Sequence, residues 1–136
     1  ELFRLSLLDV TVRWLGGFPV VRGGGDQWAL RHACRLLENG QVVVMFPEGT
    51  RNKGQGLRRG KTGAVRLALA AQCPVVPLAL NGTQRMFNRF PGRTRITMRL
   101  GAPVYAQKGE DAEALTERVM QSIAANLPPD LRGVYG

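Results

Sequence analysis

Apolar runs separated by glycine-containing turns set out an alternation of strands and helices along this chain. The unbroken run at residues 42–46 is typical of a strand covered on both faces, and Pro47 ends it because proline has no N–H to donate to a ladder. Residues 18–22 predict a shorter strand, and residues 27–39 predict a helix, because apolar side chains recur there at helical spacing until Gly40. A strand, helix, strand order implies a right-handed crossover, so the two strands are expected to be parallel.

The second half of the chain continues this alternation. Residues 61–72 predict a helix, and residues 74–80 predict a buried strand, although Pro77 is awkward inside it. Residues 95–100 alternate strictly between apolar and polar, which is typical of a half-exposed strand at a sheet edge. A last helix is expected over residues 111–127, capped by its first residue. The sequence therefore predicts an α/β fold, with a mostly parallel sheet and crossover helices.

A charged turn follows the apolar run at residues 42–46. The carboxyl ends of parallel strands open onto the binding crevice of a sheet, so this turn is a candidate binding site. Arg51 offers a planar fork for phosphate or carboxylate, Thr50 a hydroxyl, and Gly49 a turn through which backbone N–H groups can approach an anion. Glu48 would repel an anion unless it pairs with an arginine or accepts a substrate hydroxyl. By composition alone, an ordinary surface turn with an ion pair is the alternative.

Two further basic residues are expected near this turn. Arg22 ends the predicted strand at residues 18–22, so it lies on the same rim as Arg51 if the strands are parallel. Lys61 lies at the start of the predicted helix at residues 61–72, where a helix N-terminus attracts anions. A phosphate or coenzyme A contact is the functional interpretation of Lys61, and a solvated lysine is the alternative.

Charge is the most informative bulk property of the chain. Nineteen basic residues oppose ten acidic ones, and no Asp or Glu lies between Gly49 and Gly109. A field of one sign implies an anionic partner, such as a phospholipid surface, acyl-CoA phosphates or nucleic acid. Residues 84–93 interleave arginines with large apolar side chains, which suits a membrane interface, although packing against the domain is an equal alternative. Solvated basic residues without a role are the alternative for the whole interval.

Several catalytic classes are excluded or disfavoured. The single histidine, His32, lies inside a predicted helix without an orienting carboxylate five residues on, so a structural or solvated histidine is expected. Ser6 and Ser122 are the only serines, and neither lies in a nucleophile elbow. Cys34 and Cys73 are far apart and form no metal-ligand spacing, so free thiols and no metal are expected.

Residues 46–51, Phe-Pro-Glu-Gly-Thr-Arg, resemble the signature of the glycerophospholipid acyltransferases, the family that includes 1-acylglycerol-3-phosphate acyltransferase. Residues 17–22 resemble the family's second block, and residues 74–78 its fourth. The family's first block, Asn-His, four residues and Asp, supplies the catalytic base and is absent here. The resemblance therefore implies a single glycerol-phosphate acyltransferase-like domain over residues 1–136, incomplete at its N-terminus. The catalytic dyad is expected upstream of Glu1, and the chain alone is expected to be inactive.

The resemblance also implies a reaction and a site. A fatty acyl group would pass from acyl-CoA or acyl carrier protein, as co-substrate, to the free hydroxyl of lysophosphatidic acid, making phosphatidic acid for phospholipid biosynthesis. Arg22 and Arg51 would hold the acceptor's phosphate, and Glu48 would hydrogen-bond near the glycerol. Gly49 and Thr50 would shape the pocket. Residues 75–78 would lie along the path of the acyl chain, and no cofactor or metal is implied.

The expected partners are a lysophospholipid, an acyl donor and an anionic membrane surface. No run reaches the ~18 to 20 apolar residues that span a bilayer, so the protein is expected at the cytoplasmic face of the membrane, either peripheral or anchored by an upstream segment. An acyltransferase for another lysolipid and a non-catalytic lipid-binding module are alternatives. A nucleic-acid binder is disfavoured, because stacking motifs, zinc fingers and a basic helix are missing.

Overall fold

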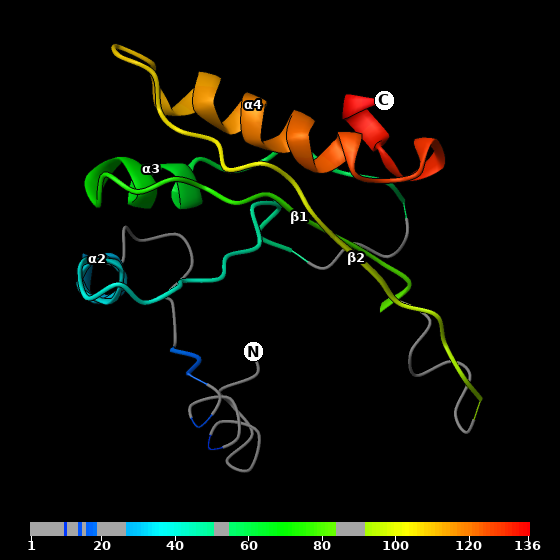
Figure 1. The fold of residues 1–136 in the computed structure, drawn as a ribbon, viewed down its shortest axis with the longest axis horizontal. Coiled ribbons are helices and arrows are strands. Elements are labelled where there is room, and N and C mark those ends of the chain that lie inside the picture. Colours follow the sequence, from blue (N-terminus) through cyan, green and yellow to red (C-terminus); the bar gives the residue numbers. More distant parts are fainter. Residues whose placement is uncertain (1–9, 11–13, 15, 19–26, 51–54, 84–91) are drawn as a thin grey trace. The chain divides into compact units, whose positions relative to one another are not determined.

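The computed structural model describes residues 10, 14, 16–18, 27–50, 55–83 and 92–136 (Figure 1). The chain divides into two compact units, residues 1–43 and residues 44–136, and each is described by itself. Within the described ranges, no helix is both long and apolar enough to cross a membrane.

The first unit contains helix α2 (Gln27–Glu38), which confirms the helix predicted over residues 27–39. Ala29 and Ala33 are buried, one turn apart on the same face. The helix ends at Glu38 and is followed by a turn at Gly40, which has a φ of 71° and donates its N–H to the carbonyl of Leu37. Glycine suits this position because it adopts the left-handed conformation without steric cost.

The strand predicted at residues 42–46 is not formed. These residues have no regular secondary structure, and the side chains of Val42 and Phe46 are 87% and 74% exposed. An apolar pattern makes a strand only where a neighbouring backbone supplies hydrogen bonds, and no described residue pairs with this run. Most of the predicted partner, residues 18–22, lies outside the described residues, so parallel pairing stays a prediction.

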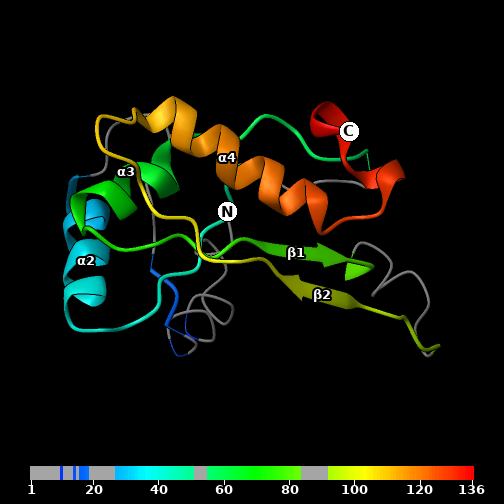
Figure 2. The same cartoon turned by 45° about the horizontal axis from the view of Figure 1, so that its top comes forward.

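The second unit is built around helix α4 (Ala112–Ala125), at the position predicted from its apolar periodicity. Asp111 caps the helix as expected, because its Oδ1 accepts a hydrogen bond from the N–H of Ala114 at 2.7 Å. Helix α4 packs against helix α3 (Gly63–Ala70) and strand β1 (Leu78–Asn81), as Figure 2 shows. The buried core of this unit consists of Leu57, Val65, Ala79, Leu115, Val119, Met120, Ile123, Ala124 and Leu127.

Strand β1 pairs with strand β2 (Thr97–Leu100) in an antiparallel ladder, and this is the only sheet among the described residues. Both strands were predicted, but each is shorter than expected. Strand β1 begins after Pro77, whose side chain is buried and whose carbonyl accepts a hydrogen bond from the N–H of Gly101. The ladder thus avoids the proline nitrogen. All four residues of β2 are exposed, so the prediction of a half-exposed strand is wrong here: the Met98 face is uncovered.

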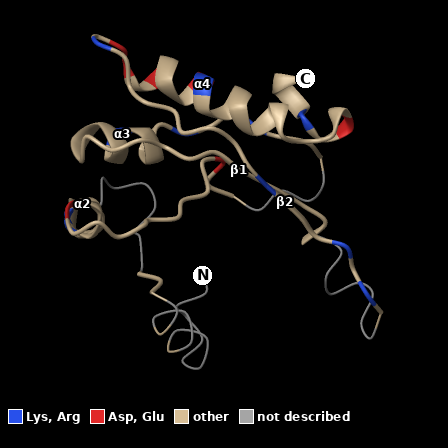
Figure 3. Cartoon of the chain, viewed as in Figure 1, with Lys and Arg blue, Asp and Glu red and all other residues tan. Residues whose placement is uncertain are grey.

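The chain ends in two short 3-10 helices, η3 (Pro129–Leu131) and η4 (Gly133–Tyr135). Helix η4 packs against α4, and Leu131 and Tyr135 lie against the core. Charges are unevenly placed in this unit. Figure 3 shows acidic residues near the N-terminal end of α4 and at η3, whereas basic residues lie along β2 and the segment that leads into it.

Candidate functional site

The Phe-Pro-Glu-Gly-Thr segment forms the turn that its sequence predicted. The N–H of Gly49 donates to the carbonyl of Phe46 at 3.0 Å, and Gly49 has a φ of 64°. A side chain at position 49 would be strained in this left-handed conformation. Glu48 is half-buried and Thr50 is exposed. Arg51 lies outside the described residues, and so does Arg22.

Lys61, which lies eleven to fifteen residues further along the chain, is brought to this turn. Its backbone N–H donates to the carbonyl of Pro47 at 2.8 Å. Its side chain lies over Gly49: a Cβ built at Gly49 would be 3.0 Å from the Cδ of Lys61 and 3.2 Å from its Nζ. The missing side chain at position 49 therefore leaves room for the ammonium group. The structure thus brings Lys61 to the turn that contains Glu48 and Gly49, and all three residues were singled out by the sequence for substrate binding.

Glu48 has a structural contact that the sequence did not reveal. Its Oε2 accepts a hydrogen bond from the backbone N–H of Arg58 at 3.1 Å. This bond joins the turn to the loop that precedes α3, ten residues away. A hydrogen bond from a backbone N–H to a carboxylate is stronger than one to a neutral acceptor. The role expected for Glu48 near a glycerol hydroxyl stays a prediction, and the same side chain also helps to place the Lys61 loop.

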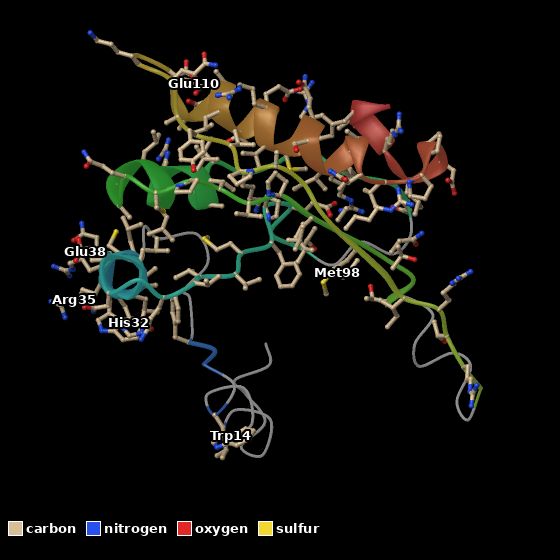
Figure 4. The ribbon with its side chains drawn as sticks, viewed as in Figure 1. Trp14, His32, Arg35, Glu38, Met98 and Glu110 are labelled. Atoms are coloured by element: carbon tan, nitrogen blue, oxygen red, sulfur yellow. The ribbon has the colours of Figure 1, made fainter. Side chains whose placement is uncertain are left out.

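His32 lies in an aromatic cluster of the first unit. Its ring stacks on Trp28 with a centroid distance of 5.2 Å and an interplanar angle of 7°, and Phe18 meets it edge-on at 5.0 Å. Figure 4 shows His32 on α2 with Arg35 and Glu38. This packing agrees with the structural role expected for His32. No cluster of three or more metal-ligating side chains occurs among the residues that the structure describes.

The family model described as Acyltransferase matches residues 1–81. The chain belongs to the acyltransferase family. The matched residues include the turn and Lys61, so the resemblance found in the sequence is confirmed. The chain is 43% identical, over 56 residues, to 1-acyl-sn-glycerol-3-phosphate acyltransferase of Haemophilus influenzae; the match covers 41% of this chain and 23% of that protein. It is 36% identical, over 119 residues, to 1-acyl-sn-glycerol-3-phosphate acyltransferase alpha of Ovis aries. That match covers 81% of this chain and 42% of that protein.

The chain also resembles a solved structure. The crystal structure of the 1-acyl-sn-glycerophosphate (LPA) acyltransferase PlsC from Thermotoga maritima matches with a TM-score of 0.71 and 24% sequence identity. The match covers 93% of this chain and 52% of that chain. The acyltransferase fold is therefore confirmed, whereas the mostly parallel sheet is not. The chain spans about half the length, or less, of the relatives it matches.

Proposed function

We propose that this acyltransferase transfers a fatty acyl group to the free hydroxyl of 1-acylglycerol-3-phosphate and so makes phosphatidic acid. The observation that carries the proposal is the placement of the Lys61 side chain over Gly49 in the signature turn. The names of the matched relatives support the same reaction. In this reaction the acceptor oxygen bonds to the acyl carbonyl, the thioester C–S bond breaks, and the hydroxyl proton passes to a base.

The described part of the site suits the anionic end of the acceptor. Lys61 brings a positive charge to a turn whose glycine leaves room for the lysine side chain. It also stands two residues before α3, where the helix dipole favours negative charge. We propose that Arg22 and Arg51 add guanidinium contacts to the same phosphate and that Glu48 and Thr50 face the glycerol. Guanidinium groups suit this task because they bind phosphate oxygens in pairs.

The general base is proposed to be the histidine of the Asn-His-x-x-x-x-Asp block, which this chain does not contain. A histidine steadied by a carboxylate is suited to take a hydroxyl proton near neutral pH. The acyl donor, either acyl-CoA or acyl carrier protein, is a co-substrate, and the proposal needs no metal or other cofactor. An acyltransferase for a different lysolipid is the alternative, because a phosphate site accepts any lysolipid with a terminal phosphate.

We further propose that the protein works at the cytoplasmic face of an anionic membrane. On and beside β2, the exposed residues Arg95 and Arg99 supply positive charge, and the exposed residue Met98 supplies apolar surface on the opposite face of the strand. Basic residues near an anionic leaflet contribute about 1 kcal/mol each to binding. The interleaved segment expected to enter the interface, residues 84–91, lies outside the described residues. Nucleic acid is not a proposed partner.

An acyl-transfer assay tests the reaction. The chain is extended upstream so that it carries the Asn-His-x-x-x-x-Asp block, and radiolabelled acyl-CoA and acyl carrier protein are each supplied with lysophosphatidic acid. We expect labelled phosphatidic acid from the extended chain and none from residues 1–136 alone. Other lysolipids are supplied in parallel assays. Transfer to one of them and not to lysophosphatidic acid would favour the alternative acceptor, and the absence of transfer to any lysolipid would overturn the proposal.

A further inference from the structure

The loop before α3 is paired with the C-terminal end of the chain through backbone groups. The N–H of Leu57 donates to the carbonyl of Leu131 at 3.0 Å, and the carbonyl of Leu57 accepts from the N–H of Val134 at 3.1 Å. Leu57 also buries its side chain in the core. Figures 1 and 2 show this segment passing beside the C-terminal turns. Leu57 is thus held by both its backbone groups and its side chain.

Two glycines allow this approach. A Cβ at Gly56 would lie 2.8 Å from the Cα of Gly133, and a Cβ at Gly133 would collide with the carbonyl oxygen of Leu57. Both residues have positive φ, 81° for Gly56 and 57° for Gly133. The two backbones therefore meet without room for a side chain at either position. Such a contact specifies one arrangement of the loop and the C-terminus.

Tyr135 extends the contact to the residue before Lys61. Its hydroxyl oxygen accepts a hydrogen bond from the N–H of Gly60 at 3.1 Å. Gly60 itself lies so close to α4 that a Cβ there would be 2.6 Å from the Cγ of Met120. The next residue, Lys61, donates its N–H to Pro47 and lays its side chain over Gly49. A continuous series of contacts therefore runs from Tyr135 to the signature turn.

We infer that residues 129–136, the C-terminal clamp, position Lys61 for the phosphate of the acceptor. Tyr135 is the positioning residue: it does not reach the ligand but fixes the backbone of Gly60, from which Lys61 extends. The inference rests on the proposed function for the identity of the ligand. The clamp lies outside residues 1–81, the part that the family model matches, so membership of the family does not indicate it.

The clamp restricts the backbone freedom of the loop that carries Lys61. Glycines at positions 56 and 60 give the loop more backbone freedom than other residues would, and that freedom would spread the Lys61 ammonium over many positions. An ammonium group that is already in place binds an anion without a further ordering cost. On the other side, Glu48 holds the same loop through the N–H of Arg58. The loop is thus fixed from the turn and from the C-terminus.

The first test removes one hydroxyl from the 136-residue chain. Tyr135→Phe keeps the ring and deletes the acceptor for Gly60. Tyr105→Phe is the matched control, because Tyr105 is exposed and lies with Leu69 and Cys73 at the C-terminal end of α3. We expect amide hydrogen exchange at Gly60 and Lys61, followed by NMR, to become about tenfold faster in Tyr135→Phe only. The thermal midpoint should be the same as in Tyr105→Phe, which shows that the chain is folded.

The second measurement reports on the ligand. Lysophosphatidic acid with a short acyl chain, used below its micelle concentration, should protect Lys61 from acetylation, with Lys108 as the internal reference. We expect Tyr135→Phe to weaken this protection by about three- to tenfold, which corresponds to one hydrogen bond, and Tyr105→Phe to leave it unchanged. Equal exchange and equal protection in both variants would overturn the inference. Faster exchange with unchanged protection would also overturn it, because the clamp would then not position Lys61.

A second variant disrupts the contact between the clamp and Leu57. Gly133→Ala collides with Leu57 and should reproduce both changes, whereas Gly109→Ala, which has a similar positive φ and open space around it, is the control for backbone strain. Absence of protection in the unaltered chain would overturn the proposed acceptor site. In that case, faster exchange at Gly60 in Tyr135→Phe and Gly133→Ala would still support the clamp as a device that orders the loop, so the two failures are distinguishable.

Discussion

Gly49 is the residue at which the signature turn depends most directly on the absence of a side chain. Replacement by alanine places a Cβ in a left-handed conformation, which costs about 1 to 2 kcal/mol of folding free energy. The new Cβ would also meet the aliphatic part of Lys61, a flexible side chain that can move away. We therefore expect Gly49→Ala to fold with reduced stability and with an altered rate of acetylation at Lys61. Urea unfolding and mass spectrometry measure the two effects.

Gly109→Ala is the matched control for this prediction, since Gly109 has a φ of 78° and no neighbouring atom where a Cβ would stand. It should lose a similar amount of stability and leave the reactivity of Lys61 unchanged. Equal reactivity of Lys61 in both variants would show that the Gly49 contact does not determine where the lysine lies.

Arg51 is expected to act on the acceptor and not on the fold. In the extended chain that carries the histidine block, Arg51→Ala should lower kcat/KM for lysophosphatidic acid by about 10- to 150-fold, because a charge-assisted contact worth roughly 1.5 to 3 kcal/mol is lost. Arg66→Ala is the control: Arg66 lies on the exposed face of α3, where it contacts Glu113 at 4.0 Å. An unchanged kcat/KM in Arg51→Ala would mean that Arg51 serves the structure.

Glu110 gives the stability of the protein a dependence on pH. Hydrogen bonds from the Arg118 guanidinium, at 2.7 and 2.8 Å, and then from the N–H of Gln107 hold the pKa of Glu110 below its usual value of 4.5. A carboxyl whose pKa is lowered by folding adds stability above its unfolded pKa and loses it as the pH falls through the folded pKa. Glu110→Gln should therefore be less stable than the unaltered chain at pH 7, and the difference should shrink below about pH 4.5.

Thermal unfolding between pH 2 and pH 7 measures this effect. Glu113→Gln is the control on the same helix, because Glu113 and Arg66 form only an exposed pair at 4.0 Å, a type of contact worth about 0 to 1 kcal/mol. A difference between Glu110→Gln and the unaltered chain that stays constant over the whole range would contradict the assignment.

At the scale of elements, helix α4 carries the core of the second unit, and its cap is the simplest way to test that role. Asp111→Ala removes the acceptor for the N–H of Ala114, and we expect it to cost about 1 kcal/mol, within a range of about 0.5 to 2 kcal/mol. Asp111→Asn keeps an oxygen acceptor and should restore most of the loss. Urea unfolding monitored by circular dichroism provides the comparison. If both variants lose the same stability, the charge of Asp111 near the helix dipole matters more than the hydrogen bond.

The helices and the strands differ in how far the sequence predicted them. Helix α2 and helix α4 match the predicted ranges within two residues at each end, because an amphipathic face and a cap are local properties. The run at residues 42–46 has a stronger apolar pattern than β2, and yet β2 is paired, whereas no described residue pairs with the run. Pairing depends on which backbone lies alongside a strand, and that is set by residues distant in sequence.

At the scale of the whole molecule, the excess of basic residues predicts reversible binding to anionic membranes. We expect the chain to sediment with vesicles that contain phosphatidylglycerol but not with purely zwitterionic vesicles. Raising the salt from 50 to about 500 mM should release most of it. Replacing Arg93, Arg95 and Arg99 by Gln should weaken binding at low salt, since all three side chains are exposed. Replacing Phe87 and Phe90 by Ser should weaken the binding that survives at high salt.

Arg66→Gln is the control for the arginine set, because Arg66 lies on α3 and not on the β2 segment. Equal sedimentation with neutral and anionic vesicles would contradict the electrostatic part of this prediction. An absence of any effect from the phenylalanine pair would indicate that residues 84–91 pack against their own domain.

The sequence by itself determined the family, the helices and the chemical character of the turn. These properties depend on residue identity and short spacing: the signature at residues 46–51, the periodicity of α4 and the interval without acidic residues can all be seen without coordinates. The sequence also predicted a turn at Gly49, but its positive φ of 64°, which favours glycine, came only from the structure.

Only the tertiary structure decided which distant groups meet. The contact of Lys61 with Gly49, the bond from Arg58 to Glu48 and the clamp of Tyr135 on Gly60 join residues ten to seventy-five positions apart. The sequence does not show which acceptor a given backbone N–H will bind, because every residue except proline has a backbone N–H. The chain folds this loop between α4 and its own C-terminus, and that packing selects the partners.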